Sequence, residues 1–393
     1  MTALDTDLRL PRDWPVLRLA FRPFYLLAAL AAVVLMPLWG LVYSGRLPLK
    51  TGLAPTLWHV HEMLFGMLGA VVVGFLFTAG KAWTGLPTPR GAALGFFVLL
   101  WLAARIASLL APYPVFFFLD LAFLPLAAAV FLHLLVEAGN TRNLGIAAVL
   151  GLLGAANLAF HLGASGALQI SSLRALHAGL ALLVLLETLI GGRVIPLFTR
   201  NAQPGLSNEV PAWREALTLL TTIAGLALWL LEAAPLLAAL ALMAAAALHV
   251  ARLITWRPLS TRARPILWVL HLAYAWIPVG LALLALALLR QQPVSPALHA
   301  LGVGASGGLV LAMMTRTARG HTGRPLQAGR TEVWAYGLIL LAALVRVVTP
   351  LLAPQLYTQG LLLAGGLFAS AFALYLRVYT AWLTSPRADG RSD

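Results

Sequence analysis

Long apolar runs recur along this chain and restrict it to one kind of fold. A helix needs about 20 apolar residues to cross a membrane, and runs of that length, separated by proline, glycine and charge, predict roughly twelve spans. The predicted spans are roughly residues 23–44, 58–79, 93–111, 114–136, 144–163, 170–198, 213–232, 234–254, 265–289, 296–316, 333–353 and 357–382. The runs are continuous rather than alternating, which indicates helices. We therefore expect an all-α, polytopic integral membrane protein with a single transmembrane domain over residues 1–393.

The composition agrees with this prediction. Of the 393 residues, 61% are hydrophobic and only 10% are charged, a balance that soluble globular domains do not have. The chain contains no cysteine, which excludes disulfides, iron–sulfur clusters and thiolate-bound haem or copper. A bound metal would therefore need histidine, methionine, aspartate, glutamate or tyrosine ligands.

Basic residues gather on one side of the predicted spans. The net charge is +14, and Lys and Arg are concentrated at both ends of the chain and in every second connection. The connections on the opposite side contain only Arg46, Lys50 and Arg290. Because positively charged loops stay in the cytoplasm, both termini are predicted to be cytoplasmic. The positive charge is explained by topology, and no nucleic-acid partner is expected.

Histidines stand at the beginning of three predicted spans. His59 and His61 begin the second, His177 the sixth and His299 the tenth, and in this orientation all three spans enter from the outer face. An imidazole inside a membrane is costly unless it has a function, and imidazole is the most common metal ligand in proteins. Helical residues two apart point about 200° away from each other, so both cannot easily bind one metal unless the first turn is unwound; alternatively, one binds a haem and the other a copper. We favour His61 over His59 as a ligand. The alternative for His59 is an interfacial residue beside Trp58.

Neighbouring residues suggest different roles for three histidines. Arg174 lies three residues before His177 and so on the same helical face, where its guanidinium suits a haem propionate; a hydrogen bond between helices is the alternative. His271 begins a polar-aromatic face with Tyr274 and is the best candidate for a ligand nearer the inner face. His161, at the end of the fifth span, is interpreted as an interfacial residue.

Charged residues inside the spans are the next candidates. Arg105 and Asp120 lie at similar depth in adjacent spans, so we predict that they pair, as charges within a membrane usually do. Glu62 and Glu187 are the other acids within the spans. They are candidates for a proton relay with burial raising their pKa, and structural hydrogen bonding is the alternative.

The three spans that begin with histidine are four apart in order. Each ends in threonine near a basic residue, which suggests three four-helix repeats at 18–140, 141–260 and 261–383. Internal repeats of this kind build binding sites where the repeats meet. Chance is the alternative explanation in a chain this rich in leucine and alanine.

Four motifs resemble the NnrS family over residues 18–382. They are Phe-Arg-Pro-Phe at 21–24, Trp-His-Val-His-Glu-Met at 58–63, Gly-Gly-Arg-Val-Ile-Pro-Leu-Phe-Thr-Arg-Asn at 191–201 and Gly-His-Thr-Gly-Arg at 320–324. The resemblance implies a bacterial inner-membrane protein that carries haem, expected to be of b type, and copper. It also implies a role in nitric oxide metabolism, denitrification and resistance to nitrosative stress.

The resemblance also implies site residues. The family's recurrent histidines correspond to possible metal ligands at His59, His61, His177, His271, His299 and His321. The residues alone favour a solvated loop position for His321. Three arginines in family motifs, Arg193, Arg200 and Arg324, are expected to form an anion or propionate site at the inner face, in addition to Arg174.

The leading hypothesis is that the protein binds or reduces nitric oxide at a haem with copper nearby. Protons would arrive through Glu62 or Glu187, and electrons from an unknown donor. Twelve spans with inward histidines are also similar to heme-copper oxidases and nitric oxide reductases, which is an analogy of fold alone. Two alternatives stay open: a non-catalytic nitric oxide sensor or buffer, and a transporter of copper, haem or a nitric oxide adduct. Membrane lipid and nitric oxide are the expected partners.

Overall fold

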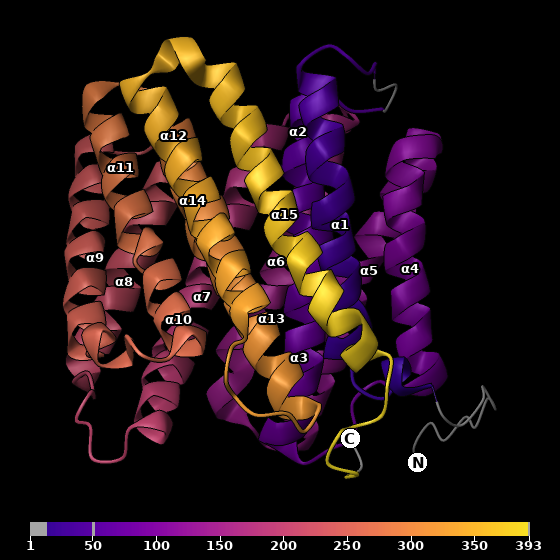
Figure 1. Ribbon diagram of the computed structural model, residues 1–393. Coiled ribbons are helices and arrows are strands. Elements are labelled where there is room, and N and C mark those ends of the chain that lie inside the picture. Colours follow the sequence, from indigo (N-terminus) through magenta and orange to yellow (C-terminus); the bar gives the residue numbers. More distant parts are fainter. Residues whose placement is uncertain (1–13, 49–51, 392–393) are drawn as a thin grey trace.

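The computed structural model describes residues 14–48 and 52–391, and over these residues the chain is helical without strands (Figure 1). Nine of its long helical segments are unbroken: α1 (Phe21–Tyr43), α4 (Gly91–Leu110), α5 (Tyr113–Glu137), α6 (Leu144–Ala164), α7 (Ser172–Ala202), α8 (Ala212–Leu230), α9 (Pro235–Thr255), α14 (Arg330–Leu352) and α15 (Tyr357–Leu383). Short 3-10 turns precede or join them: η1 (Pro15–Leu17), η3 (Thr141–Asn143), η4 (Pro258–Thr261) and η6 (Pro354–Leu356).

Three further long segments of the described chain are composite. The first runs through α2 (Pro55–His61), η2 (Glu62–Leu68) and α3 (Gly69–Thr84). The second joins α10 (Pro265–Tyr274) to α11 (Trp276–Arg290), and the third runs through α12 (Ser295–His299), η5 (Ala300–Gly307) and α13 (Gly308–His321). Both η2 and η5 are π-helical. The predicted all-α polytopic architecture is confirmed.

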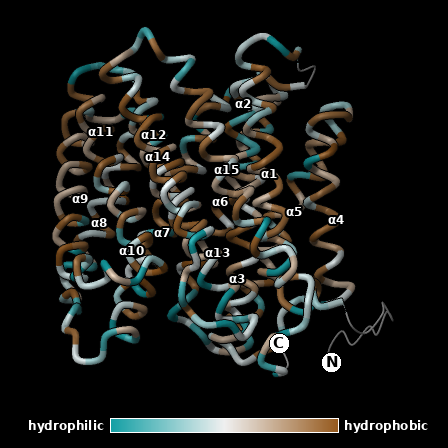
Figure 2. The backbone as a smooth tube through the Cα atoms, in the orientation of Figure 1, coloured by the Kyte–Doolittle hydropathy of each residue, from teal (hydrophilic) through white to brown (hydrophobic). Residues whose placement is uncertain are grey.

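Eleven of these segments are long and apolar enough to cross a membrane. The remaining one, α8, has Arg214 and Glu215 in its first turn, which shortens its apolar run. The largest differences from the predicted boundaries are at the ends of α3 and α13, which extend to Thr84 and His321. Apolar residues cover most of the helical surfaces, and hydrophilic residues gather towards the connections (Figure 2), as expected for helices in lipid.

The two π-containing segments form the centre of the bundle. The segments Pro55–Thr84 and Ser295–His321 are the most deeply buried of the candidate spans, at 83% and 67%, and α7 contacts both of them. In each, the α-helix changes to a π-helix directly after a histidine, His61 or His299. A π-helix inside an α-helix frequently marks a functional site.

A π-helix directly after a histidine occurs in two of the three predicted repeats. The segment that carries His177, α7, is α-helical along its whole length. The threefold repeat at 18–140, 141–260 and 261–383 therefore stays a prediction. The last helix, α15, packs along both α14 and α1, so the end of the described chain lies against its beginning (Figure 1).

Candidate metal centre

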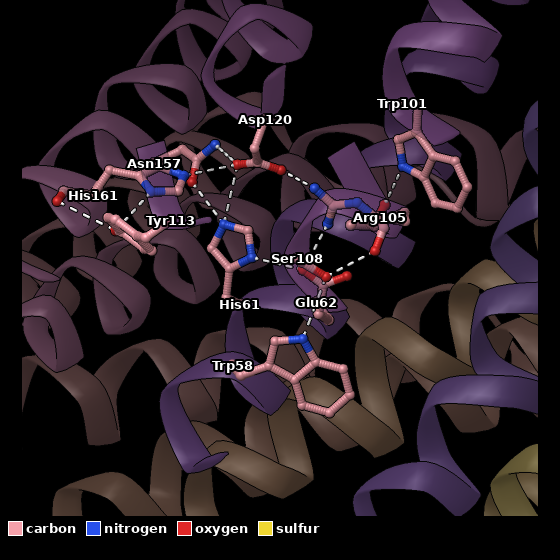
Figure 3. A network of polar contacts seen from close by, with 11 residues as sticks. Trp58, His61, Glu62, Trp101, Arg105, Ser108, Tyr113, Asp120, Asn157 and His161 are labelled. Carbon is pink, nitrogen blue, oxygen red and sulfur yellow. Dashed lines mark hydrogen bonds and ion pairs between the residues drawn. The ribbon is translucent and has the colours of Figure 1, made fainter. Parts of the chain in front are cut away.

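A cluster of buried polar side chains joins four helical segments of the first half of the chain (Figure 3). One side chain ends α2 and the next begins η2, while the others come from α4, α5 and α6. We call this group the His61–His161 cluster. Its members are His61, Glu62, Arg105, Asp120, Asn157 and His161.

Three of these side chains direct possible metal ligands at one another. One ligand atom each of His61, Asp120 and His161 lies within 4.8 Å of the other two. Asp120 Oδ2 is 3.1 Å from His61 Nε2 and 3.0 Å from His161 Nε2. Two imidazoles and a carboxylate are a common donor set for transition metals such as iron and copper. The geometry is therefore that of a candidate metal centre.

The outer nitrogens of both imidazoles are also engaged. Glu62 Oε1 lies 3.1 Å from His61 Nδ1, and Tyr113 Oη lies 3.0 Å from His161 Nδ1. If each Nδ1 carries the proton and donates it to its partner, both Nε2 lone pairs face Asp120. Hydrogen bonds of this kind orient the histidines of metal sites.

Asn157 completes the inner face of the cluster. Its Nδ2 donates to Asp120 Oδ2 at 2.6 Å, and its Oδ1 lies 3.0 Å from His61 Nε2. Asn157 and His161 are four residues apart and therefore lie on one face of α6. Several lone pairs thus converge on a small volume, which requires a proton or a metal cation between them.

Arg105 holds the two carboxylates of the cluster. It donates to Glu62 Oε1 at 3.1 Å and pairs with Asp120 Oδ1, which confirms the predicted Arg105–Asp120 pair. The guanidinium lies so close to Gly66 of η2 that a Cβ there would collide with it. Glycine at this position therefore allows Arg105 to reach both acids.

The charges of the cluster do not balance. Glu62 and Asp120 bring two carboxylates, and Arg105 brings one guanidinium. All three are buried, and an uncompensated buried charge is strongly unfavourable. With neutral histidines, the cluster retains one negative charge and is suited to a cation.

His59 faces a different set of residues from His61. Its imidazole stacks on Trp39 with ring centroids 4.5 Å apart, and it interacts electrostatically with Arg346 and His299. The structure therefore agrees with the expectation that the two histidines of this motif point apart. His299 lies with His59 and outside the His61–His161 cluster.

His177 lines a pocket of about 360 Å³ together with Arg174. The imidazole stacks on Trp229 with ring centroids 5.0 Å apart, and Arg174 pairs with the exposed Glu232 at 2.6 Å. The other walls of this pocket are mostly apolar. The predicted histidine–arginine pair thus lies on a pocket, as a haem edge would require.

His271 and His321 contact other residues. His271 Nε2 lies 3.1 Å from Thr199 Oγ1, and its buried Nδ1 has no hydrogen-bond partner in the described parts of the chain. The ring of His321 packs on Phe21 at 5.4 Å, and its carbonyl accepts a hydrogen bond from Arg387. Neither residue contacts the His61–His161 cluster through these partners.

The three arginines expected at an inner-face anion site have separate partners. Arg193 donates to Asn143 Oδ1 at 2.7 Å, and Arg200 pairs with Glu209 at 3.1 Å. Arg324 lies over the Trp382 ring at 4.3 Å. The structure gives no shared contact that would join them into one site.

Glu187 lines an apolar cavity of about 90 Å³ at the centre of the bundle. Residues from η2, α3, α7 and α13 form most of the wall, so the second, sixth and tenth spans meet there. Glu187 Oε2 and Ser306 Oγ are buried and interact with each other, and neither has hydrogen-bond geometry with any other described residue. Glu187 is the carboxylic acid in this wall.

The interpretation of His161 as an interfacial residue is wrong, because the residue is fully buried in the cluster. The sequence contains a signal that identifies it. Asn157 and His161 are the hydrogen-bonding side chains of an otherwise apolar predicted span, 144–163, and they share a helical face. Asp120, predicted as a partner of Arg105, also contributes to the candidate metal centre.

Together, the fold and the cluster define a polytopic helical membrane protein with a buried histidine–carboxylate centre. A family model described as NnrS protein matches residues 15–387. The chain therefore belongs to the NnrS family, which links it to nitric oxide metabolism and to metal and haem binding. No curated protein matches the chain.

Proposed function

We propose that this protein binds copper at the His61–His161 cluster and a haem at the His177 pocket, and that it binds or reduces nitric oxide. The observation that carries the proposal is the convergence of His61, Asp120 and His161 within 4.8 Å. His61, His161 and Asp120 would hold the copper. Bound copper would supply one-electron chemistry and an open position for a small ligand.

The charge of the cluster favours a cation of low charge. Two carboxylates and one guanidinium leave one negative charge in a buried site, which a cuprous ion would neutralise. Glu62 and Tyr113 would keep both Nε2 lone pairs directed inward. Arg105 would fix the orientation of Asp120, and the burial of the cluster would exclude bulk water.

The pocket beside His177 fits a haem edge by its residues. It offers an imidazole for the iron, a guanidinium for a propionate and apolar walls for the ring. Arg174 would exchange its exposed partner Glu232 for the propionate. His177 and Arg174 are therefore the proposed haem-binding residues.

The central cavity suits a small, weakly polar molecule such as nitric oxide. Its volume of about 90 Å³ accommodates a diatomic molecule, and its wall is almost entirely apolar. Glu187 would donate protons there, because its carboxyl group lines the cavity and forms no ion pair with the described residues. Glu62 is the second proposed member of the proton relay, as a carboxylate that accepts a proton and passes it on, since its Oε2 is also unpartnered.

We also propose a location and partners for the protein. The concentration of basic residues on one side of the spans supports cytoplasmic termini and a location in the inner membrane of a bacterium. The histidines of α2 and α12, and His177 near the beginning of α7, would then lie near the outer face. Electrons would come from a membrane or periplasmic donor.

The experiment is metal and haem analysis of the purified protein in detergent. Wild type, His61→Ala, His161→Ala and His177→Ala are compared with His133→Ala, whose exposed side chain contacts Glu137. We expect copper to be lost in the His61 and His161 variants, haem to be lost in the His177 variant, and both to be retained in the control. Equal copper in wild type and a His61→Ala, His161→Ala double variant would contradict the copper site.

Nitric oxide consumption then separates reduction from buffering. Loaded wild type is supplied with a reductant, and nitric oxide is followed with an electrode and by the optical spectrum. Continuous consumption supports a reductase. A spectral shift without turnover supports a nitric oxide buffer, and the absence of both would refute a direct action on nitric oxide.

A further inference from the structure

Arg346 of α14 is a buried cation without a carboxylate partner in the described chain. The residue is 8% exposed. It donates a hydrogen bond to Tyr357 Oη at 3.0 Å and lies over the ring of the same tyrosine at 5.2 Å. A tyrosine hydroxyl is neutral, so this contact leaves the charge of the guanidinium uncompensated.

The other arginines that are buried in the described structure either pair with a carboxylate or donate to several carbonyl oxygens. Arg105, Arg252 and Arg319 each pair with a carboxylate, and Arg22 donates to backbone carbonyls at the end of α15. A buried charge in a membrane span is costly unless something pairs with it. The contrast indicates that Arg346 is suited to an anion that the chain does not itself supply.

Two histidines complete the surroundings of Arg346. His59 and His299 both interact electrostatically with Arg346 and with each other. The buried Nδ1 of His59 has no hydrogen-bond partner in the described residues. His299 Nδ1 lies 2.7 Å from the Ser295 carbonyl, which requires a proton on that nitrogen.

This group lies near the ends of several helices. Both histidines are only partly buried, and they stand at the beginnings of the second and tenth spans. Trp39, Tyr357 and Arg346 lie at the corresponding ends of α1, α15 and α14. All of these helix ends are on the side of the bundle opposite the end of α15 (Figure 1).

The positive charge of the Arg346 guanidinium favours an anionic ligand. A metal cation between His59 and His299 would be repelled by Arg346, whereas an anion would be attracted. The planar fork of a guanidinium matches two oxygens of a carboxylate or a similar planar group. A planar oxyanion is therefore better suited to this group than the metal that the sequence pattern suggests.

We propose that Arg346, Tyr357 and His59 form a binding site for a planar oxyanion. The ligand is either a free anion of the nitrite or acetate type, or the propionate of a bound haem. The site is separate from the His61–His161 cluster and does not require a metal there. The proposal rests on the proposed function only if the ligand is a haem propionate.

The test is a melting-temperature series on the full-length protein in detergent. Protein from cells grown with and without a haem precursor is titrated with sodium nitrite or sodium acetate at constant ionic strength. A ligand that binds the folded protein raises its melting temperature. The variants are Arg346→Gln and Tyr357→Phe, with Arg290→Gln as the control for an exposed arginine at the end of α11.

For a free anion, the melting temperature of wild type rises in both preparations by roughly a few degrees at saturation. The rise is absent in Arg346→Gln, weaker in Tyr357→Phe and unchanged in Arg290→Gln. For a haem propionate, the rise occurs only in the haem-free preparation, and Arg346→Gln purifies with less haem. An equal rise in wild type and Arg346→Gln, or no rise together with full haem in the variant, would overturn the proposal.

The stability of Arg346→Gln without ligand is a second readout. Because no carboxylate loses its partner, this variant is expected to melt at or above the temperature of wild type. A purely structural arginine would instead be destabilised by the change. If Arg346→Gln does not fold, Arg346→Lys replaces it in the titration. Lysine keeps the positive charge but lacks the two parallel N–H donors of a guanidinium. An anion affinity of Arg346→Lys equal to that of wild type would refute bidentate binding.

Discussion

Asp120 Oδ2 lies 3.0 Å from His161 Nε2, while the other oxygen of the same carboxylate pairs with Arg105. One oxygen of the carboxylate is therefore held by a cation, and the other oxygen, which also accepts from Asn157, faces the imidazoles. Because Arg105 also binds Glu62, which contacts His61 Nδ1, one guanidinium orients the partners of both histidines. Stability and ligand geometry are thus coupled through Arg105.

Replacing Arg105 is expected to destabilise the fold strongly. Arg105→Gln leaves two buried carboxylates without their cation, and breaking a buried pair in this way costs about 3–5 kcal/mol. Unfolding in detergent, followed by intrinsic fluorescence, measures the loss. Arg290→Gln, at the exposed end of α11, should unfold like wild type. Equal stability of the two variants would show that the cluster does not depend on the ion pairs.

Tyr113 is expected to tune metal affinity without being a ligand. Tyr113→Phe removes the hydroxyl 3.0 Å from His161 Nδ1, and loss of such an outer partner lowers metal affinity by about 10- to 100-fold. Competition with a copper chelator measures the affinity. Tyr43→Phe, on α1 and outside the cluster, is the matched control. Unchanged affinity in Tyr113→Phe would contradict the proposed role of the hydroxyl.

Gly66 is expected to tolerate no side chain. In Gly66→Ala the new methyl group collides with the Arg105 guanidinium, and overpacking of this kind costs about 1–3 kcal/mol. Copper content should fall as well, because Arg105 can no longer hold both acids. Gly337→Ala on α14 is the control, since a Cβ there meets no atom within 4 Å. Two variants with the same melting temperature would argue against this packing.

Glu187 is expected to matter for turnover more than for folding. Glu187→Gln keeps a polar group beside Ser306, so the melting temperature should change little. If Glu187 donates protons in the central cavity, nitric oxide reduction should fall by about 10²- to 10⁴-fold. An electrode assay of loaded protein with a reductant measures the rate. Full activity in the variant would remove Glu187 from the mechanism.

The membrane architecture is predictable from the sequence because lipid requires long apolar helices. The Arg105–Asp120 pair is predictable for a related reason: two opposite charges at one depth in adjacent spans have few other ways to be compensated. Both predictions use depth alone. Depth follows directly from position along a span.

Rotation about the helix axis is harder to predict, and the candidate site depends on it. His59 and His61 lie at the same depth, yet His61 meets His161 and His59 meets Arg346. The π-helical turns of η2 and η5 change the rotation of the residues that follow, and the apolar pattern does not reveal them. The sequence therefore predicts which histidines lie at the same depth, but not which of them contact one another.

The three arginines predicted at the inner face show a second limit of prediction from the sequence. Arg193, Arg200 and Arg324 are where the positive-inside rule places arginines in any case. Their positions alone therefore cannot separate an anion site from topology. Their separate partners, Asn143 and Glu209 among them, become visible only in the folded chain.

The packing of α15 along α1 has a consequence for assembly. Arg22 of α1 donates to the carbonyls of Leu383 and Ser385, which are among the last described residues to be synthesised. These contacts therefore cannot form until the residues after α15 have been added. A chain truncated before residue 383 would lack both acceptor carbonyls, so truncation there is expected to destabilise α1 although α1 itself is intact.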